Sequence, residues 1–341
     1  MSGLRYGAIR VALQAIAATG LDRMLGPRTR GLGCILTFHR VTHDPAPLLP
    51  ENAGLYITPE FLDVALDEVK RCGYDIIALD ALPERMAAKG ERPFVVLTFD
   101  DGYKDLRDHA LPVLKAHDAP FAAFICTGFA DRAAPLWWLD LEDVVQRAGD
   151  MLEIAMPHGL PVSASLRSTA EKQAALRTLY WRLRALDEPA FRQVIGGLQY
   201  RYQIEPTRRL NDLCLEWSEL EALVTEPLLT LGAHSMTHPR IGLLPIEDAE
   251  REMRVSRDTI AAHLGITPKH FCYPVGDQTA AGAREAEIAR RLGYVTALTT
   301  RPGVLREGLD MQLLPRISVN GLFQNPSYLR ALISGVPFML R

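Results

Sequence analysis

Two short motifs contain residue types that could hold a metal ion and move a proton. In the first, Asp100 and Asp101 directly follow the apolar run Phe94–Phe99 and precede Gly102. One carboxylate of such a pair can bind a cation while its neighbour, kept ionised by that cation, acts as a base. By itself, an Asp-Asp-Gly sequence is equally compatible with a solvated turn or the start of a helix.

The second motif places His234 and His238 four residues apart, just after the apolar run 228–233 and just before Pro239. Two imidazoles at this spacing lie on the same side of a helical turn and can bind one metal ion. Such a pair alone is more often structural, but a second motif with carboxylates favours a metal site. One of the two Asp together with the two His leaves positions open for water and substrate. These ligands suit Zn²⁺, with other first-row divalent ions as competitors.

Both motifs follow segments that we expect to be strands of a parallel sheet. Continuous apolar runs are typical of strands buried on both faces; they occur at 34–39, 94–99, 121–126, 228–233, 270–273, 294–299 and 314–319. Helical patterns separate many of them, for example at 58–69, 245–264 and 281–292. This alternation predicts an α/β fold, either a barrel or an open sheet, with functional residues at the carboxyl ends of strands.

One long segment interrupts the alternation. Residues 135–217 show helical patterns and no convincing strand, so we interpret them as a helical insertion between the two motifs. The sequence also predicts an amphipathic helical segment at 1–30, a barrel domain at 31–325 and an apolar C-terminal helix at 326–341.

Composition excludes several classes of function. The 341 residues include 38 basic and 41 acidic side chains, giving a net charge of −3, so we expect no nucleic-acid partner. The five cysteines form no C-x-x-C pair, which argues against a disulfide framework or a thiolate zinc site. No apolar stretch is long enough to span a membrane, and we expect a cytoplasmic protein. The N-terminal helix can pack on its own domain or lie on the inner face of a membrane, and the C-terminal stretch is apolar enough to touch that surface as well.

The sequences Leu97-Thr-Phe-Asp-Asp-Gly-Tyr103 and His234-Ser-Met-Thr-His-Pro239 resemble the first two signature motifs of the polysaccharide deacetylases, the NodB-homology carbohydrate esterases. The resemblance covers roughly residues 31–320 and implies a distorted (β/α) barrel. It also implies roles for four residues of these motifs. The base is Asp100, and the metal ligands are Asp101, His234 and His238.

The family's third motif is matched only in part, by Phe271-Cys-Tyr-Pro-Val-Gly276. Cys272 replaces the Arg that orients the base in the family. Arg316, at the end of a later predicted strand, could supply this cation or could be an ordinary ion-pair residue. The backbone N–H of Val275 falls where the family has an oxyanion donor, and a backbone donor does not depend on the side chain. The predicted oxyanion and substrate residues are Tyr273, Pro274 and Val275.

The family's last motif, Leu-x-x-His near the C-terminus, has no counterpart because no His follows His270. The sequence Leu36-Thr-Phe-His39 has the same spacing at the end of the first predicted strand. Since a barrel is circular, this motif can move from the last strand to the first without leaving the site. The arrangement resembles a permuted branch related to biofilm-polysaccharide deacetylases and implies His39 as the general acid. A His that caps the strand is the alternative, and His43 is a weaker candidate acid.

The resemblance implies a metal-dependent hydrolase that removes an N-acetyl group from an amino sugar and releases acetate. The substrate would be a cell-envelope or exopolysaccharide glycan, or its lipid-linked precursor. Two alternatives remain open, a non-catalytic carbohydrate-binding relative and a deacylase or deformylase of a small amide. A glycosidase would need two carboxylates flanking the bond and no His pair. Three tryptophans could stack on sugars or lie in the core: Trp137, Trp138 and Trp217.

Overall fold

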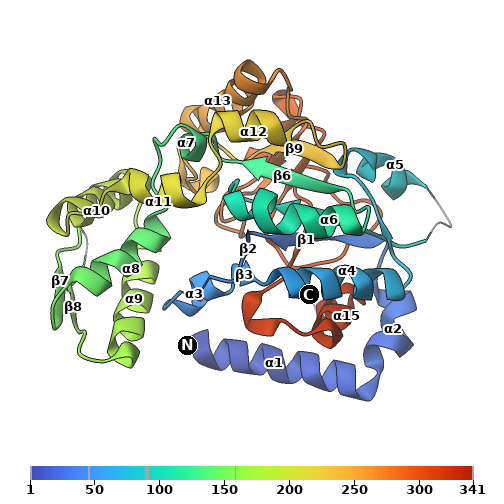
Figure 1. Ribbon diagram of the computed structural model, residues 1–341, viewed down its shortest axis with the longest axis horizontal. Helices are drawn as coiled ribbons and strands as arrows, with labels where there is room; N and C mark the ends of the chain where they lie inside the picture. The colour runs from blue at the N-terminus through green and yellow to red at the C-terminus, as the bar shows by residue number, and fades with distance from the viewer. Residues whose placement is uncertain (1, 45–46, 89–91, 158, 340–341) are drawn as a thin grey trace.

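The computed structural model describes residues 2–44, 47–88, 92–157 and 159–339. Its main sheet has eight strands in the order β11-β10-β9-β6-β5-β1-β12, and β4 pairs with the first residues of β5 (Figure 1). The strands are β1 Gly33–Phe38, β4 Asp75–Ile76, β5 Phe94–Phe99, β6 Phe121–Ile125, β9 Leu229–Ala233, β10 His270–Cys272, β11 Thr296–Leu298 and β12 Ile317–Ser318. Neighbouring strands of this sheet are parallel, as the continuous apolar runs predicted.

The sheet curls into a distorted barrel. Leu314 bridges to Leu298 of β11, and three residues later Ile317 of β12 pairs with Leu36 of β1. The segment between Leu314 and Ile317 therefore connects the two ends of the sheet. The predicted α/β fold with a distorted (β/α) barrel is confirmed.

Helices cover the outside of the sheet and extend beyond it (Figure 1). The α-helices are α1 Ser2–Thr19, α2 Leu21–Thr29, α3 Pro50–Ala53, α4 Pro59–Arg71, α5 Leu82–Ala87, α6 Leu111–Ala116, α7 Thr127–Ala130, α8 Trp137–Arg147, α9 Thr169–Arg184, α10 Glu188–Arg201, α11 Pro206–Leu213, α12 Trp217–Leu223, α13 Ile246–Leu264, α14 Ala283–Arg291 and α15 Pro326–Ile333. Short 3-10 helices occur at Leu79–Ala81, Ile241–Leu243, Gly321–Phe323 and Val336–Phe338, and a π-helix at Leu106–Ala110. A small second sheet pairs β2 Arg40–Val41 with β3 Tyr56–Ile57. None of the described helices combines the length and apolar character needed to cross a bilayer.

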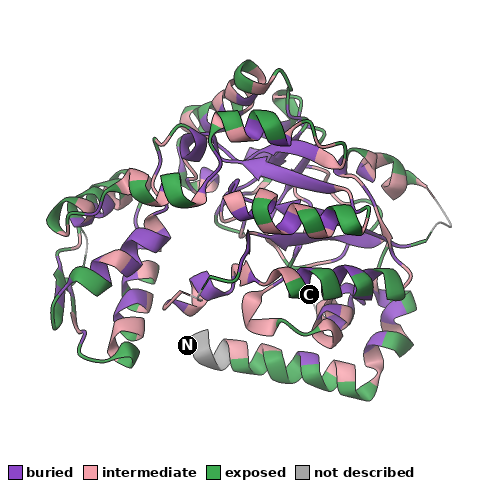
Figure 2. Ribbon diagram, viewed as in Figure 1, coloured by how far each residue is buried: buried purple, intermediate pink, exposed green. Residues whose placement is uncertain are grey.

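Alternating side chains on the strands separate two apolar cores. Leu97 of β5 and Tyr273 after β10 belong to the core between the sheet and the helices. Val96 of β5 and Cys272 of β10 belong to the core inside the barrel. The central strands are buried along their whole length (Figure 2). This alternation decides which residues of the strand-end motifs can face the barrel mouth.

The insertion lies beside the barrel and has a core of its own, which includes Leu141, Leu176 and Leu179 (Figure 1). It is helical over α8–α11, but the expectation that it contains no strand is wrong. Met151–Ile154 (β7) and Val162–Ser165 (β8) form an antiparallel hairpin. Four-residue strands give too short an alternation to recognise, and β8, with the sequence Val-Ser-Ala-Ser, is poor in typical strand residues.

The C-terminal segment differs from the single helix expected at 326–341. The helix α15 ends at Ile333, and residues 340–341 lie outside the described part of the chain. Gly335 follows with φ of 78°, and a Cβ there would lie 2.2 Å from the carbonyl oxygen of Thr29. The chain therefore leaves the helical path where it meets the end of α2.

Candidate active site

The strand-end motifs meet at one cavity of about 250 Å³ at the carboxyl ends of the strands. Its lining includes most of the residues singled out from the sequence: His39, Asp100, Asp101, Trp137, Trp138, His234, His238, Val275 and Arg316. Other lining residues come from β1, the segment around α3, helix α9 and the strand-end loops: Thr37, Glu51, Asn52, Leu55, Tyr180, Arg184, Thr300 and Ser318. Segments far apart in the sequence therefore build a single site.

Asp101, His234 and His238 are arranged as ligands of one cation. The Oδ1 atom of Asp101 lies 3.4 Å from Nε2 of His234 and 3.3 Å from Nε2 of His238. This oxygen is buried without a hydrogen-bond partner among the described residues. The three donor atoms lie within 4.8 Å of one another, close enough to bind one ion. One carboxylate with two imidazoles is a common donor set for Zn²⁺. The residues present fit a divalent metal ion.

The rings of both histidines are held by their surroundings. Nδ1 of His234 lies 2.8 Å from the carbonyl oxygen of Cys272, so this nitrogen donates and Nε2 is free to bind a metal. The ring of His238 packs between Phe129 and Trp138, at centroid distances of 5.6 and 5.1 Å. These contacts fix the orientation of the two donor nitrogens.

Glu252 of α13 holds the loop between the two histidines. Its carboxylate accepts hydrogen bonds from the backbone N–H groups of Met236 and Thr237, at 2.9 and 2.8 Å, and from the Thr237 hydroxyl at 2.6 Å. Asp101, Ser235 and His238 all have positive φ, at 74°, 64° and 59°. Non-glycine residues adopt this conformation only where the surroundings enforce it. The hydrogen bonds that Glu252 accepts from Met236 and Thr237 help to hold the loop between Ser235 and His238 in this conformation.

Asp100 points into the barrel and forms a buried bidentate ion pair with Arg316. The guanidinium Nη1 lies 2.9 Å from Oδ1 and Nη2 lies 2.7 Å from Oδ2, and both side chains are at most 2% exposed. Arg316 also donates from Nε to the carbonyl oxygen of Thr299 and from Nη1 to the Thr98 hydroxyl. The structure thus brings Arg316 to the position of a cation that orients the base.

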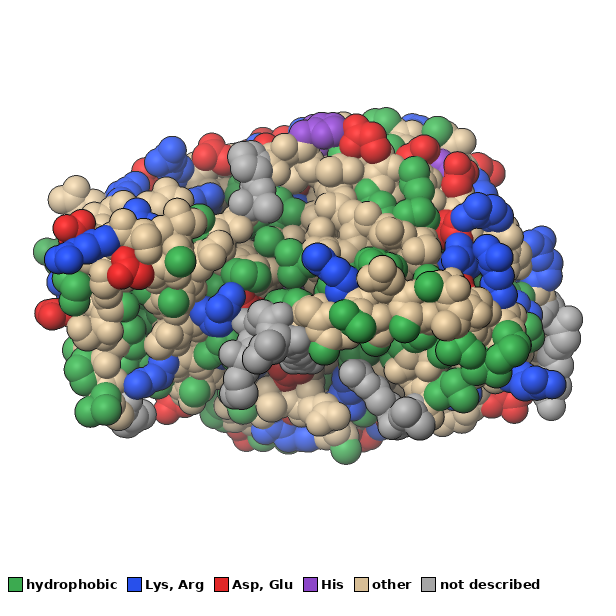
Figure 3. Space-filling model, turned by 90° about the horizontal axis from the view of Figure 1, so that it is seen from below, with side chains coloured by type: hydrophobic (Ala, Val, Ile, Leu, Met, Phe, Trp, Pro, Cys, Tyr) green, Lys and Arg blue, Asp and Glu red, His purple; other side chains and the backbone are tan. Residues whose placement is uncertain are grey.

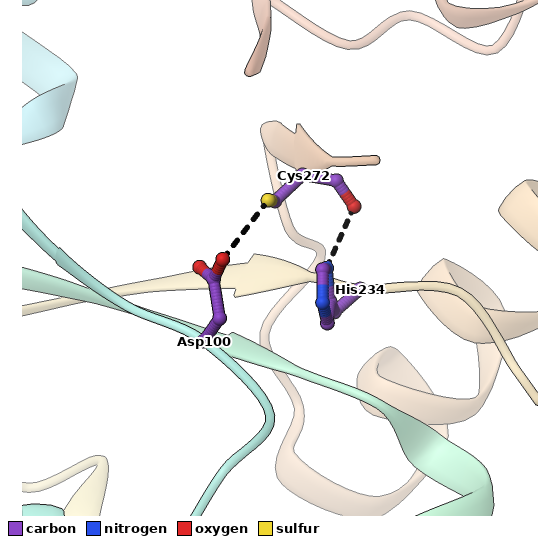
Figure 4. A group of neighbouring side chains, drawn as sticks. All are labelled: Asp100, His234 and Cys272. Carbon is purple, nitrogen blue, oxygen red and sulfur yellow. Dashed lines mark hydrogen bonds between the residues drawn. The ribbon is translucent and has the colours of Figure 1, made fainter. Parts of the chain in front are cut away.

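Cys272 connects this pair to His234. Its Sγ lies 3.5 Å from Oδ2 of Asp100 and accepts a hydrogen bond from Nη2 of Arg316 at 2.9 Å. Figure 4 shows the thiol facing Asp100 while the carbonyl of the same residue faces His234. Asp100, His234 and Cys272 are close enough to form a second donor set. The guanidinium of Arg316 already contacts the carboxylate and the sulfur, so this inner group does not suit a cation.

Burial and charge set the protonation states of the two aspartates. Burial opposes ionisation of Asp100, but the Arg316 guanidinium outweighs it and lowers the pKa of this carboxyl below its usual value. Burial likewise opposes ionisation of Asp101, whereas His234 and His238 lower its pKa well below the usual value. Both groups are therefore carboxylates at neutral pH, as a base and a metal ligand require.

His39 directly follows β1 and lines the cavity, with Nε2 3.9 Å from Oδ2 of Asp100. Burial lowers the pKa of this imidazole, and the nearby carboxylates of Asp100 and Asp101 oppose the shift. His43, the weaker candidate, is 62% exposed and lies 3.5 Å from Glu60. It does not line the cavity. The geometry favours His39 as the group that exchanges a proton in the site.

Among the three predicted oxyanion and substrate residues, only Val275 lines the cavity. Its φ is 63°, and its N–H donates to no acceptor found among the described residues. The prediction that Tyr273 contacts substrate is wrong. Its side chain is fully buried in the outer core, and its hydroxyl donates to the carbonyl oxygen of Gln312. Because side chains alternate along a strand, Tyr273 faces the helices if Cys272 faces the barrel. Pro274 does not line the cavity either.

The insertion contributes a wall to the cavity. Trp137 stacks on Tyr180 with centroids 5.3 Å apart, and both line the cavity together with Trp138 and Arg184. Trp217 does not: it stacks on His263 at 4.1 Å, and its N–H donates to Asp131. Sequence reasoning singled out none of the other lining residues, which include Glu51, Asn52, Tyr180 and Arg184.

Comparison with known proteins agrees with this geometry. The sequence profile of polysaccharide deacetylase matches residues 87–160 and 167–297, more than half of the chain. The chain belongs to the polysaccharide deacetylase family. The matched ranges include Asp100, Asp101, His234, His238 and Val275, whereas His39 and Arg316 lie outside them. A comparison with curated proteins found no significant match.

Solved structures of deacetylases share the fold of this polysaccharide deacetylase. Streptococcus pyogenes deacetylase PplD, solved in complex with acetate, is 18% identical with a TM-score of 0.57, covering 88% of this chain and 97% of that one. IcaB from Ammonifex degensii is 17% identical with a TM-score of 0.55, covering 87% and 97%. The de-N-acetylase from Aggregatibacter actinomycetemcomitans is 13% identical with a TM-score of 0.55, covering 88% and 99%. These likenesses confirm the fold, and the family match confirms the predicted family and supports deacetylation of a glycan.

Proposed function

We propose that the chain is a metal-dependent hydrolase that removes an N-acetyl group from an amino sugar and releases acetate. The substrate we propose is a cell-envelope or exopolysaccharide glycan or its lipid-linked precursor. One observation carries this proposal: the cluster of Asp101, His234 and His238 shares a cavity with a carboxylate base that is paired to a buried cation. The family membership supports the glycan as substrate.

The metal would be held by Asp101, His234 and His238, and Zn²⁺ fits this donor set best, with other first-row divalent ions as alternatives. When bound, such an ion supplies Lewis-acid chemistry, which lowers the pKa of water and polarises a carbonyl group.

The remaining residues divide the proton transfers and charge stabilisation between them. Asp100, held ionised by Arg316, accepts the proton of the attacking water at its carboxylate. The Val275 N–H donates a hydrogen bond to the oxygen of the former acetyl carbonyl as negative charge develops on it. His39 donates a proton to the departing nitrogen, which is otherwise a poor leaving group. The products are acetate and a free amino sugar.

Acetate release from N-acetylglucosamine oligomers and from lipid-linked N-acetyl sugars tests the proposal. We expect release by the metal-loaded protein and none after chelation or in Asp100→Asn. If no acetyl sugar is hydrolysed although the protein binds stoichiometric metal, the reaction assignment is wrong. Hydrolysis of only formyl or other small amides would instead establish the deacylase alternative, and glycan binding without hydrolysis the non-catalytic one.

We also propose peripheral membrane contact through the two ends of the chain. Val11 of α1, Met24 of α2 and Met339 are 66%, 64% and 51% exposed, and α1 contains no acidic residue. Figure 3 views the face on which α1 lies and shows hydrophobic side chains among Lys and Arg side chains. Sedimentation with vesicles of anionic lipid tests this: the wild type should sediment, and Val11→Asp combined with Met24→Asp should stay in solution. Wild-type protein that stays in solution would overturn it.

A further inference from the structure

The cavity has room for about one sugar ring. Its volume is about 250 Å³, below the roughly 300–1,000 Å³ that pockets for drug-sized ligands usually have. If the acetylated ring occupies it, any further ring of a glycan lies outside, across the rim. The nature of this rim therefore decides whether the protein acts on single sugars or on chains.

One part of the rim, formed by α3 and α9, carries an exposed aromatic ring in a fixed orientation. Trp181 of α9 is 48% exposed, and its indole N–H donates to Oε1 of Glu51 at 3.4 Å. The guanidinium of Arg184 lies 5.2 Å from the centroid of the Trp181 ring. Glu51 and Arg184 both line the cavity, so Trp181, which does not itself line it, contacts two of its lining residues.

Glu51 retains unused hydrogen-bonding capacity beside this ring. Its side chain is only 9% exposed, and its Oε2 atom has no hydrogen-bond partner among the described residues. Arg177 pairs with the other oxygen, with Nε 3.7 Å from Oε1. An ionised carboxylate can accept several hydrogen bonds, and leaving an oxygen unpaired in a buried place is costly. A ligand with hydroxyl groups would satisfy it.

We propose that Trp181 and Glu51 form a second sugar subsite, which binds the ring linked to the N-acetylated sugar. The C–H face of that ring packs on the exposed indole, and Glu51 accepts hydrogen bonds from its hydroxyl groups. The protein is thereby selective for oligosaccharide chains over monosaccharides. This inference rests on the proposed function for the placement of the acetylated ring in the cavity.

Kinetics on N-acetylglucosamine and its dimer, trimer and tetramer test the subsite in the metal-loaded protein. We expect kcat/KM to rise from the monosaccharide to the longer oligomers in the wild type. In Trp181→Ala, the preference for the tetramer over the monosaccharide should fall about tenfold, mainly through KM. Trp181→Phe, which keeps a ring but loses the N–H, should fall in between. The control is Tyr200→Ala, because Tyr200 is 90% exposed on α10 of the same insertion and does not line the cavity.

Two results would overturn the subsite: a wild type that shows no preference for oligomers, or a Trp181→Ala protein that keeps the full preference. If the wild type releases no acetate from any of these sugars, the proposed function fails, and calorimetric binding of the tetramer decides the subsite separately. Weaker tetramer binding by Trp181→Ala than by Tyr200→Ala would then support it. Equal binding by the two variants, or no binding to the wild type, would refute it.

Discussion

Replacing Arg316 removes the guanidinium that pairs with Asp100, the proposed base. Its guanidinium makes two hydrogen bonds to Asp100, of 2.9 and 2.7 Å, and one each to Thr98 and Thr299, all inside the barrel. Removing one partner of a buried ion pair costs about 3–5 kcal/mol, because the other charge stays buried and unpaired. We therefore expect Arg316→Ala to lower the free energy of unfolding by this amount.

The same change should impair catalysis. Without Arg316, burial raises the pKa of Asp100 with less opposition, and the carboxylate loses its fixed orientation. Because general-base catalysis contributes about 10²–10⁴-fold, kcat should fall at least about hundredfold in the folded variant. Arg316→Lys restores the charge but not the two-pronged geometry, so it should recover stability more than activity.

Urea denaturation and acetate release, measured on both variants and on Arg290→Ala, check these numbers. Arg290 pairs with Glu287 and Asp310 at the surface, where a salt bridge is worth about 0–1 kcal/mol. The control should therefore lose little stability and no activity. If Arg316→Ala unfolds at the urea concentration of the wild type, or keeps more than a tenth of its kcat, Arg316 is not the partner of the base.

Three further predictions follow from the site and its surroundings. His238→Ala or Asp101→Ala should lose bound metal in elemental analysis while keeping the wild-type circular dichroism spectrum; retention of stoichiometric metal would contradict the ligand set. Glu252→Ala should weaken metal binding about 10–100-fold in a chelator competition, with Glu252→Gln intermediate, because the backbone N–H groups of the loop between the histidines lose the carboxylate that accepts their hydrogen bonds. Unchanged affinity would show that this loop keeps its conformation without Glu252. Burial raises the pKa of Asp140 in α8 from 3.8 to about 6, so the protonated form is favoured by folding and stability is lost as the pH rises from about 4 to 6. The unfolding free energy of Asp140→Asn relative to wild type should thus increase by about 2 kcal/mol between pH 4 and pH 7, and a pH-independent difference would refute this.

The sequence predicted those parts of the site that each lie within one short segment. The end of β5 delivers Asp100 and Asp101, and the loop after β9 delivers His234 and His238, because a buried strand followed by polar residues is a local pattern. Gly102 is local in the same sense, because its φ of 74° suits a glycine in the turn that follows the two aspartates. Such features can be recognised without knowing what packs against them.

The sequence could not predict the contacts that join distant segments. Trp181 and Glu51 are 130 residues apart, and neither belongs to a motif. Their contact depends on how the insertion packs against α3, and such tertiary packing leaves no periodic pattern in the sequence. The orientation of Tyr273 was missed for a different reason: the short strand β10 ends at Cys272, so the alternation that turns Tyr273 outward has only three residues to reveal it.

The pairing of Arg316 with Asp100 explains how the site accommodates Cys272 at the position of the family's arginine. The residues Arg316 and Asp100 are 216 positions apart, yet the curl of the sheet brings the segment before β12 to the base. The small side chain of Cys272 leaves room for the guanidinium, whose Nη2 lies 2.9 Å from Sγ. An arginine at 272 would place a second guanidinium against the same carboxylate, with one of the two cations left without a partner in a buried place. The absence of arginine at 272 and its presence at 316 therefore belong together, because the proposed base pairs with a guanidinium that reaches it from the segment before β12.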